Sequence, residues 1–472
     1  MEDRLAHINT AINIANTVRT TLGPRGMNKL VMNNQNPILT NDGATIIRNI
    51  HHPHPIMDSI KALAFSQEQA VGDGTSTSMI LIAELLENAL TMINQGIHQT
   101  NIINGYNIAA SECVKFLKTK EFDADRKKVI KTCFGAKTSK EFSEHLSNIL
   151  VDLDIEDLQI YKFSNSNPLK TEVQNGFIFE GFTINDQMPT EGCGKIAVLD
   201  TRGDLELTKF EVTKAEELEN ITKYNRDYKQ GIVDKLVELG VKTLFYSDTN
   251  PELETLLTES GIMSIVTYDR SIITNICKST GSIVIGDPKR IEEKSIGNGT
   301  VTFLKNPNRI IIKNKDSKIK TLILHGSTKQ TLDESGRAID DVVGLLRNSD
   351  KCVYGAGSIE IDISLHLNEF SKNIGGKEQI VVERFANAIE SIPITLAKNC
   401  GFDAIDILTS LKSMHREGDD EAGVDDRLMI SSTKDRGIIE PTIIKMHSIL
   451  GATEVCNLVL KLDDIYNGEE TK

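Results

Sequence analysis

The sequence predicts a multidomain protein of the α plus α/β class, in which an α/β unit is inserted into a helical domain. In the first third, Leu5, Ile8 and Ile12 recur at three- and four-residue spacing, which places them on one helical face. The middle alternates short apolar segments with helical ones, as is typical of an α/β domain with some parallel strand pairing. After Gly326 the pattern is helical again. Insertion of the α/β segment into one helical domain is the simplest explanation of this helical, α/β, helical order along the chain.

The helical parts follow from apolar spacing and from their stop signals. The first helix is expected to end at Gly23-Pro24, because proline disfavours continuation. A second helix at 76–93 is too apolar to be amphipathic, so it should be buried among other helices. The C-terminal part predicts helices at 332–347, 358–370, 379–399, 404–415 and 441–462.

The middle of the chain predicts short buried strands separated by helices. The expected strands are 196–199, 243–246, 265–268, 283–285, 309–312 and 321–324. The expected helices between them are 252–260 and 271–280, and a charged helical stretch covers 205–236.

Composition excludes several classes of partner. Lys+Arg 53 against Asp+Glu 67 gives a net charge of −14, and aromatic residues make up only 5% with no Trp, so no nucleic-acid partner is expected. The apolar run 79–83 is stopped by Glu84, so no membrane partner is expected either. Seven scattered cysteines without a CxxC pair indicate a reducing compartment, and we expect a cytoplasmic protein.

The stretch VGDGTSTS at 71–78 opens the apolar helix at 76–93. Free N–H groups at a helix start form an anion site, which glycines let a phosphate approach closely. A carboxylate there would oppose an anion unless a divalent cation lay between them, so Asp73 is interpreted as a Mg²⁺ ligand. The alternative is that Asp73 is an ordinary N-cap. The octapeptide taken by itself favours this alternative.

Two further loops expose backbone through glycine. TTLGPRGMNK at 20–29 lacks the spacing of a Walker A motif, and by itself it is a helix-ending turn. TNDGATI at 40–46 places Asp42 in a turn, where Asn-Asp-Gly can be merely a tight turn. Each loop alone is weak evidence of function.

Together, in this order and spacing, the three loops resemble the nucleotide-binding signature of the chaperonin family. Other segments extend the resemblance: TCFGAK at 132–137, SGRAIDDV at 335–342, VYGAGSIE at 353–360 and GIIEPT at 437–442. They are similar to the family's TSxxSK, ERSLHDAL and VxGGGAxE segments and to the stretch whose acidic residue holds the nucleotide ribose.

The resemblance implies an ATPase with ATP and Mg²⁺ as cofactors. It gives catalytic roles to Asp341, Asp42 and Lys137 and a metal-binding role to Asp73. The nucleotide-binding residues that it implies are Thr21, Leu22, Gly23, Pro24, Asp42, Gly43, Gly72, Asp73, Gly74, Thr75, Ser76, Thr77, Gly355, Ala356, Gly357 and Glu440. Asp341 would come from a different domain than the phosphate loops, so domain closure and hydrolysis would be one event.

The resemblance also implies a chaperonin fold. Its helical equatorial domain would comprise 1–125 and 353–472. A small α/β intermediate domain would comprise 126–178 and 327–352, and an inserted α/β apical domain with a lid protrusion would comprise 179–326.

Within the family, IEPTIIK, KLDDIY and LILHGSTKQTLDE are most similar to the group II ring of the eukaryotic cytosol, CCT/TRiC. Segments 26–29, 67–69, 215–218 and 326–328 resemble the theta-type paralogue, whereas 400–404 is more like eta and IEPTIIK more like alpha, with delta a weaker match. This implies seven paralogous subunits in a two-ring hexadecamer and unfolded clients such as actin and tubulin. The chain is shorter than usual for the family, as expected of a shortened form from a reduced genome.

The loop at 353–360 departs from the family pattern. Ala356 replaces the middle glycine, and its methyl group is expected to crowd a nucleotide or to require negative φ. This leaves open a structural ring subunit that binds nucleotide but hydrolyses it little. A free-standing ATP-dependent metabolic enzyme is a third possibility, and it predicts a small particle.

Overall fold

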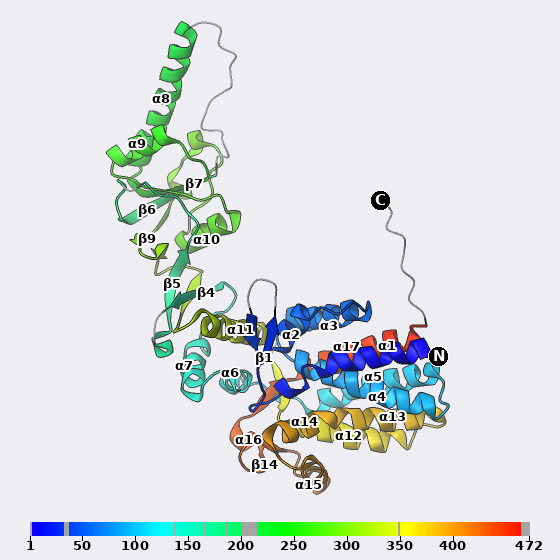
Figure 1. Cartoon of the computed structure of the whole chain (residues 1–472). Coiled ribbons are helices and arrows are strands. Elements are labelled where there is room, and N and C mark those ends of the chain that lie inside the picture. Colours follow the sequence, from blue (N-terminus) through cyan, green and yellow to red (C-terminus); the bar gives the residue numbers. More distant parts are fainter. Residues whose placement is uncertain are drawn as a thin grey trace. The chain divides into compact units, whose positions relative to one another are not determined.

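The computed structural model describes residues 2–32, 37–135, 137–164, 167–185, 187–200, 215–347 and 350–463, without the side chains of 2–4 and 215–222. The chain divides into two compact units (Figure 1). A helical unit comprises Met1–Leu153 and Thr328–Lys472, and an α/β unit comprises Asp154–Ser327. The predicted class, α plus α/β with an inserted α/β segment, is confirmed. The finer division into equatorial, intermediate and apical segments stays a prediction.

The core of the helical unit is built around one apolar helix, α4 (Thr75–Asn94). It packs against α1, α13 and α17, which run alongside it in Figure 1. Residues such as Ile80, Leu85 and Leu86 are fully buried there, because α4 meets helices on several sides. The long helices of this bundle are α1 (Glu2–Asn16), α3 (Ile56–Val71), α5 (Gln99–Lys120), α13 (Lys377–Ile389) and α17 (Thr442–Lys461).

Two of these helices, α4 and α17, are long and apolar enough to cross a membrane by length and composition alone. The expectation that Glu84 ends the apolar run is therefore wrong for α4, which stays apolar enough over Thr75–Asn94. In the fold the two helices pack on each other, and more than half of each apolar stretch is buried inside the protein. Burial in a helical core accounts for their apolarity.

The remaining elements of the helical unit are shorter. Its helices are α2 (Gly43–Asn49), α6 (Arg126–Phe134), α7 (Lys140–Leu150), α11 (Lys329–Leu346), α12 (Ser358–Ser371), α14 (Ser391–Cys400), α15 (Ala404–Arg416) and α16 (Thr433–Arg436). Its strands form three small sheets. Two of them are antiparallel pairs, β1 (Lys29–Met32) with β2 (Pro37–Thr40) and β13 (Ala422–Asp425) with β14 (Met429–Ser432). The third has three strands in the order β15 (Ile439–Pro441), β12 (Lys351–Tyr354) and β3 (Phe122–Asp123).

Two helix predictions need correction. The first helix ends at Asn16, and a single 3₁₀ turn at Arg19–Thr21 carries the chain to Gly23. The predicted helix at 379–399 is two helices, α13 and α14. Pro393 is the reason, because it cannot donate a hydrogen bond to the preceding turn. The helices α3 and α5 were not predicted individually.

The α/β unit holds an eight-stranded sheet of order β4-β11-β5-β10-β9-β6-β7-β8. Parallel pairing, as predicted, joins β6 to β7, β7 to β8 and β4 to β11. The strand bounds are β4 (Leu158–Ser164), β5 (Glu172–Phe179), β6 (Glu191–Leu199), β7 (Val241–Tyr246), β8 (Met263–Val266), β9 (Gly297–Lys305), β10 (Asn308–Lys313) and β11 (Lys320–Gly326).

The predicted helices of this unit are α9 (Pro251–Glu259) and α10 (Arg270–Thr280). The predicted strand at 283–285 is wrong, because only Ile285 bridges to β6 while Ile283 and Val284 are exposed. The charged segment 205–236 overlaps α8 (Ala215–Glu238), and its first part, 205–214, lies outside the described residues. Strands β4, β5 and β9 were missed.

Candidate functional site

A cavity of about 370 Å³ opens in the helical unit, within the size range of ligand pockets. Its walls come from segments that are far apart in the sequence. All three glycine loops singled out in the sequence contribute to it, and they do so beside α6, α14 and the end of β15. The lining includes Thr21, Leu22, Gly23, Pro24, Asp42, Gly43, Asp73, Gly74, Thr75, Ser76, Thr77, Lys137, Ala356, Gly357 and Glu440.

The start of α4 forms one wall. Gly74 is its N-cap, with φ of 91°, and no side chain caps the helix. A Cβ at Gly74 would lie 2.5 Å from Cγ2 of Ile444, so glycine is required for both conformation and space. The N–H groups of the first turn of a helix have no partner within it, and Thr75, Ser76 and Thr77 line the cavity. The site is therefore suited to an anion.

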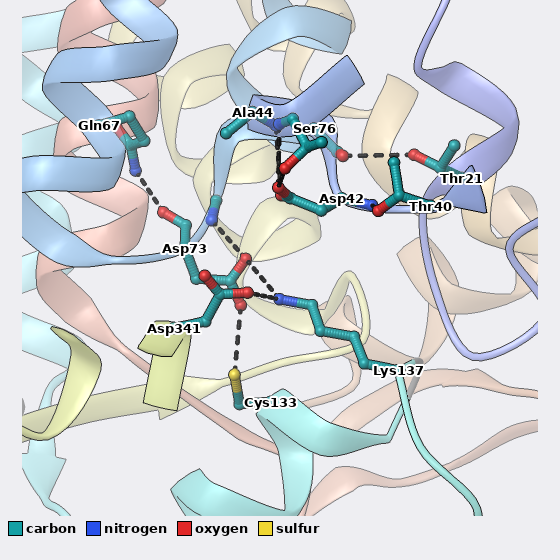
Figure 2. A network of polar contacts seen from close by, with 12 residues as sticks. Thr21, Thr40, Asp42, Ala44, Gln67, Asp73, Ser76, Cys133, Lys137 and Asp341 are labelled. Carbon is teal, nitrogen blue, oxygen red and sulfur yellow. Dashed lines mark hydrogen bonds and ion pairs between the residues drawn. The ribbon is translucent and has the colours of Figure 1, made fainter. Parts of the chain in front are cut away.

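Asp73 precedes this helix start without capping it. Its carboxylate oxygen Oδ1 accepts the N–H of Gly74 at 2.7 Å, and its carbonyl accepts from Nε2 of Gln67 at 2.8 Å (Figure 2). The second oxygen, Oδ2, accepts a weak hydrogen bond from Sγ of Cys133 at 3.7 Å. The alternative of Asp73 as the N-cap is wrong, since Gly74 occupies that position.

Lys137 points between two carboxylates (Figure 2). Its Nζ lies 2.5 Å from Oδ2 of Asp341 and 3.6 Å from Oδ1 of Asp73. Burial lowers the pKa of Lys137, but Asp341 and Asp73 outweigh it, so the pKa lies well above its usual value. Burial, together with the charges of Asp73 and Asp42, raises the pKa of Asp341 to about 8 despite Lys137. The cluster thus holds more negative than positive charge.

Asp42 caps α2. Its carboxylate accepts the N–H groups of Ala44 and Thr45, at 3.2 and 2.9 Å, and the hydroxyl of Thr45 at 2.5 Å. The next residue, Gly43, packs against α4, where a Cβ would lie 2.6 Å from Oγ of Ser76. The same hydroxyl lies 3.4 Å from Oγ1 of Thr21, so Ser76 joins the three loops (Figure 2).

Comparison with known proteins decides the family. A profile of the TCP-1/cpn60 chaperonin family matches residues 14–469. The chain belongs to the TCP-1/cpn60 chaperonin family. Among its relatives, thermosome subunit beta of Archaeoglobus fulgidus is 31% identical, with 96% of this chain and 89% of the relative aligned. Thermosome subunit alpha of Thermoplasma acidophilum is 28% identical, with 97% and 90% aligned. Family membership implies an ATP-dependent chaperone ring subunit.

This chaperonin pocket has a second acidic group, Glu440 in β15. Oε2 of Glu440 forms an ion pair with Nζ of Lys445 at 2.6 Å. Gly355 lies behind it, where a Cβ would be 2.6 Å from Oε1 of Glu440. Gly355, Gly72 and Asp341 do not line the cavity themselves, although they were predicted as site residues. They pack behind residues that do.

Ala356 corrects the expectation about its backbone. It adopts φ of 54°, in the left-handed region, rather than negative φ. Its carbonyl accepts the N–H of Val424 at 2.9 Å, so β13 holds the loop in this conformation. A residue with a side chain is strained there by about 1 kcal/mol.

Several residues of the site were missed from the sequence. Asn399 donates through Nδ2 to the carbonyls of Arg19 and Leu22, at 3.1 and 2.8 Å, and so holds the first loop. Asp425 and Asp426 line the cavity, although they belong to an acidic run, 417–426, of the kind that is usually a solvated loop. Asp425 is instead buried and accepts two backbone N–H groups. No local pattern signals these long-range roles.

The donor set fits a magnesium-bound phosphate. Among the described residues no group of three or more His, Cys, Asp or Glu side chains has the arrangement of a protein-only metal site. Mg²⁺ commonly uses one or two carboxylates, with phosphate oxygens and water completing its octahedron. Asp73 supplies such a carboxylate beside the anion site of α4, and the charges of Asp73 and Asp42, which raise the pKa of Asp341, favour a cation.

Proposed function

We propose that the chain is an ATP-dependent protein-folding chaperone subunit of a hetero-oligomeric double-ring complex. It would couple Mg-ATP binding and hydrolysis to lid closure around unfolded clients. One observation carries the proposal: Lys137 and Asp341 pair at 2.5 Å beside Asp73, where α4 begins without a side-chain cap from the described residues. An ATPase needs such a combination of anion site, cation site and hydrolytic carboxylate.

The residues of the chain divide the work between binding and hydrolysis. Backbone N–H groups and hydroxyls at 75–77, with the Thr21–Gly23 turn, would hold the phosphates. Lys137 would stabilise charge on the terminal phosphate. Asp42 and Asp341 would orient the attacking water, and Asp341 would accept its proton.

Asp73 would hold Mg²⁺, which supplies charge neutralisation on the phosphate oxygens when it is bound. The raised pKa of Asp341 suits a proton acceptor, since an acceptor works best with a pKa near the working pH. Glu440 would receive the ribose hydroxyls. The other proposed nucleotide contacts are Leu22, Pro24, Gly43, Ala356 and Gly357, which line the same cavity.

The finer assignment is to the CCT/TRiC branch, with the theta-type paralogue the nearest. The sequence segments IEPTIIK, KLDDIY and LILHGSTKQTLDE support it. This assignment implies seven paralogous partner subunits in a hexadecamer. It also implies clients of the actin and tubulin class and a cytoplasmic location. Mass spectrometry of the native particle tests it by identifying the co-assembled subunits. A ring of identical chains would contradict it.

Hydrolysis is tested in rings that carry Asp341→Ala in this subunit alone. Single-turnover phosphate release should fall by the fraction of the ring's hydrolysis that this subunit contributes, while the particle stays near a megadalton in size. Unchanged release would favour the alternative, a structural subunit that binds nucleotide but hydrolyses it little. The left-handed Ala356 motivates that alternative, because it stiffens a loop of the cavity. A small particle would instead indicate a free-standing enzyme.

A further inference from the structure

A buried lysine joins the cavity to the interior of the helical unit. Nζ of Lys445, in the first turn of α17, lies 2.7 Å from Oε1 of Glu360 and 2.6 Å from Oε2 of Glu440. The side chains of Lys445 and Glu360 are each only 5% exposed. Burial lowers the pKa of Lys445, but the two carboxylates outweigh it and keep the ammonium charged.

The carboxylate of Glu440 is held from two sides. Lys445 binds one oxygen, and the other lies against Gly355, where there is no room for a Cβ. Glu440 also lines the cavity and keeps a quarter of its side chain exposed. Its position is therefore fixed by Lys445 and Gly355, while the rest of the side chain faces the cavity.

The chemistry of Glu440 differs from that of the phosphate end. A carboxylate repels phosphate but accepts hydrogen bonds from hydroxyl groups, and two neighbouring ribose hydroxyls are suitable donors. An accepting group discriminates best when it cannot move to solvent once the hydroxyl is missing. Lys445 and Glu360 provide that restraint, since both are buried and neither is free to follow Glu440 outward.

We propose that Lys445, supported by Glu360, is a positioning residue that makes the cavity prefer ribonucleotides over 2′-deoxyribonucleotides. This rests on the proposed nucleotide-binding function. Without the ammonium, Glu440 would lose its fixed position, and the contribution of the 2′-hydroxyl to binding would disappear. The groups proposed to hold the phosphates lie elsewhere in the cavity, so their contacts would be kept when the ammonium of Lys445 is removed.

The test compares the Kd of ATP with that of 2′-deoxy-ATP, by calorimetry on the full chain with Mg²⁺. The wild-type chain should bind ATP roughly tenfold more tightly or better, as expected for a hydrogen bond to a charged group. In Lys445→Met the Kd of ATP should rise while the Kd of 2′-deoxy-ATP stays the same, so that the two differ by no more than about twofold. Glu360→Gln should reduce the ratio in part.

A matched control is Lys229→Met. Lys229 is also buried and paired, at 2.8 Å from Glu252, but it lies in the α/β unit. Its substitution should leave the ATP to deoxy-ATP ratio unchanged. A purely structural role for Lys445 would lower both affinities together, or lower the melting temperature without changing the ratio.

Distinct results separate the two proposals. If the wild-type chain binds neither nucleotide, the proposed function fails. If it binds both equally, or if Lys445→Met keeps the wild-type ratio, the positioning role is overturned. Should Lys445→Met not fold, Glu360→Gln decides, since an unchanged ratio in that variant overturns the role as well.

Discussion

The ammonium of Lys137 lies 2.5 Å from a carboxylate oxygen of Asp341, although 204 residues separate them in the chain. Their side chains are only 13% and 12% exposed, so the pair is largely shielded from water. Asp73 stands 3.6 Å from the same ammonium. One cation thus lies between two carboxyl groups, and each of the three depends on the others for its charge state.

Removal of the cation should be costly. Lys137→Met leaves Asp341 and Asp73 together without a counter-charge, and breaking a buried pair costs about 3–5 kcal/mol. Urea denaturation at about pH 9, where Asp341 with its pKa of about 8 is ionised, measures the loss. The double variant Lys137→Met/Asp341→Asn should recover part of it, because no unpaired charge then remains at position 341. As a control, Lys351→Met breaks an exposed pair with Asp123 and should have no measurable effect.

Asp341 should give stability a distinctive pH dependence. Folding raises its pKa from 3.8 to about 8, so the folded chain holds a proton that the unfolded chain releases. The stabilising contribution is complete below pH 3.8 and is lost as pH rises through about 8. The melting temperature of the wild type minus that of Asp341→Asn should therefore fall from pH 6 to pH 9, because only the wild type loses this contribution. A difference that rises over this range would contradict the assignment.

Asp341→Asn should also impair hydrolysis selectively. Loss of a positioned proton acceptor lowers the rate by roughly 100-fold or more, while nucleotide affinity is retained. Single-turnover release of phosphate and a nucleotide-binding titration measure the two effects. Asp340→Asn changes the exposed neighbour and serves as the matched control. Equal loss in both variants would indicate a structural effect on α11.

Glycine at the start of α4 should be irreplaceable. Gly74 and Gly96 both have left-handed backbones, with φ of 91° and 83°, but only Gly74 is crowded, whereas a Cβ at Gly96 would meet nothing within 4 Å. Gly96→Ala should cost about 1 kcal/mol from strain alone. Gly74→Ala should cost clearly more and should abolish nucleotide binding. Chemical denaturation and a binding titration compare the two.

Asp73→Asn should change the magnesium requirement of nucleotide binding. The variant should need roughly tenfold more Mg²⁺ or more for half-maximal nucleotide binding, since it has lost a charged ligand. With EDTA present, it should bind nucleotide as well as the wild-type chain or better, because a carboxylate that repels phosphate is gone. A Mg²⁺ requirement equal to that of wild type would contradict the role of Asp73.

Relief of backbone strain should show at position 356. Ala356→Gly removes a methyl group from a left-handed residue and should stabilise the chain by about 0.5–1 kcal/mol. Ala452→Gly, in the buried interior of α17, should destabilise it instead. Thermal denaturation of both variants gives the signs. If Ala356→Gly also speeds hydrolysis, the strained loop limits turnover.

Local chemistry predicted the parts of the site that are continuous in sequence. The glycines and hydroxyls of VGDGTSTS indicated an anion site at a helix start, and α4 begins there with an uncapped first turn. The prediction failed where a partner lies far along the chain. Pro393 divided a predicted helix, and Asn399 and Asp425 joined the site through contacts that periodicity does not report.

The sequence by itself determined the fold class, the family and the loops of the cavity, because glycine conformation, apolar spacing and motif order are local properties of the chain. Only the tertiary structure decided which charges meet. It paired Lys137 with Asp341 and buried Lys445 between Glu360 and Glu440. The physical reason is that an ion pair depends on distance and burial in space, and neither is encoded in the spacing of residues along one segment.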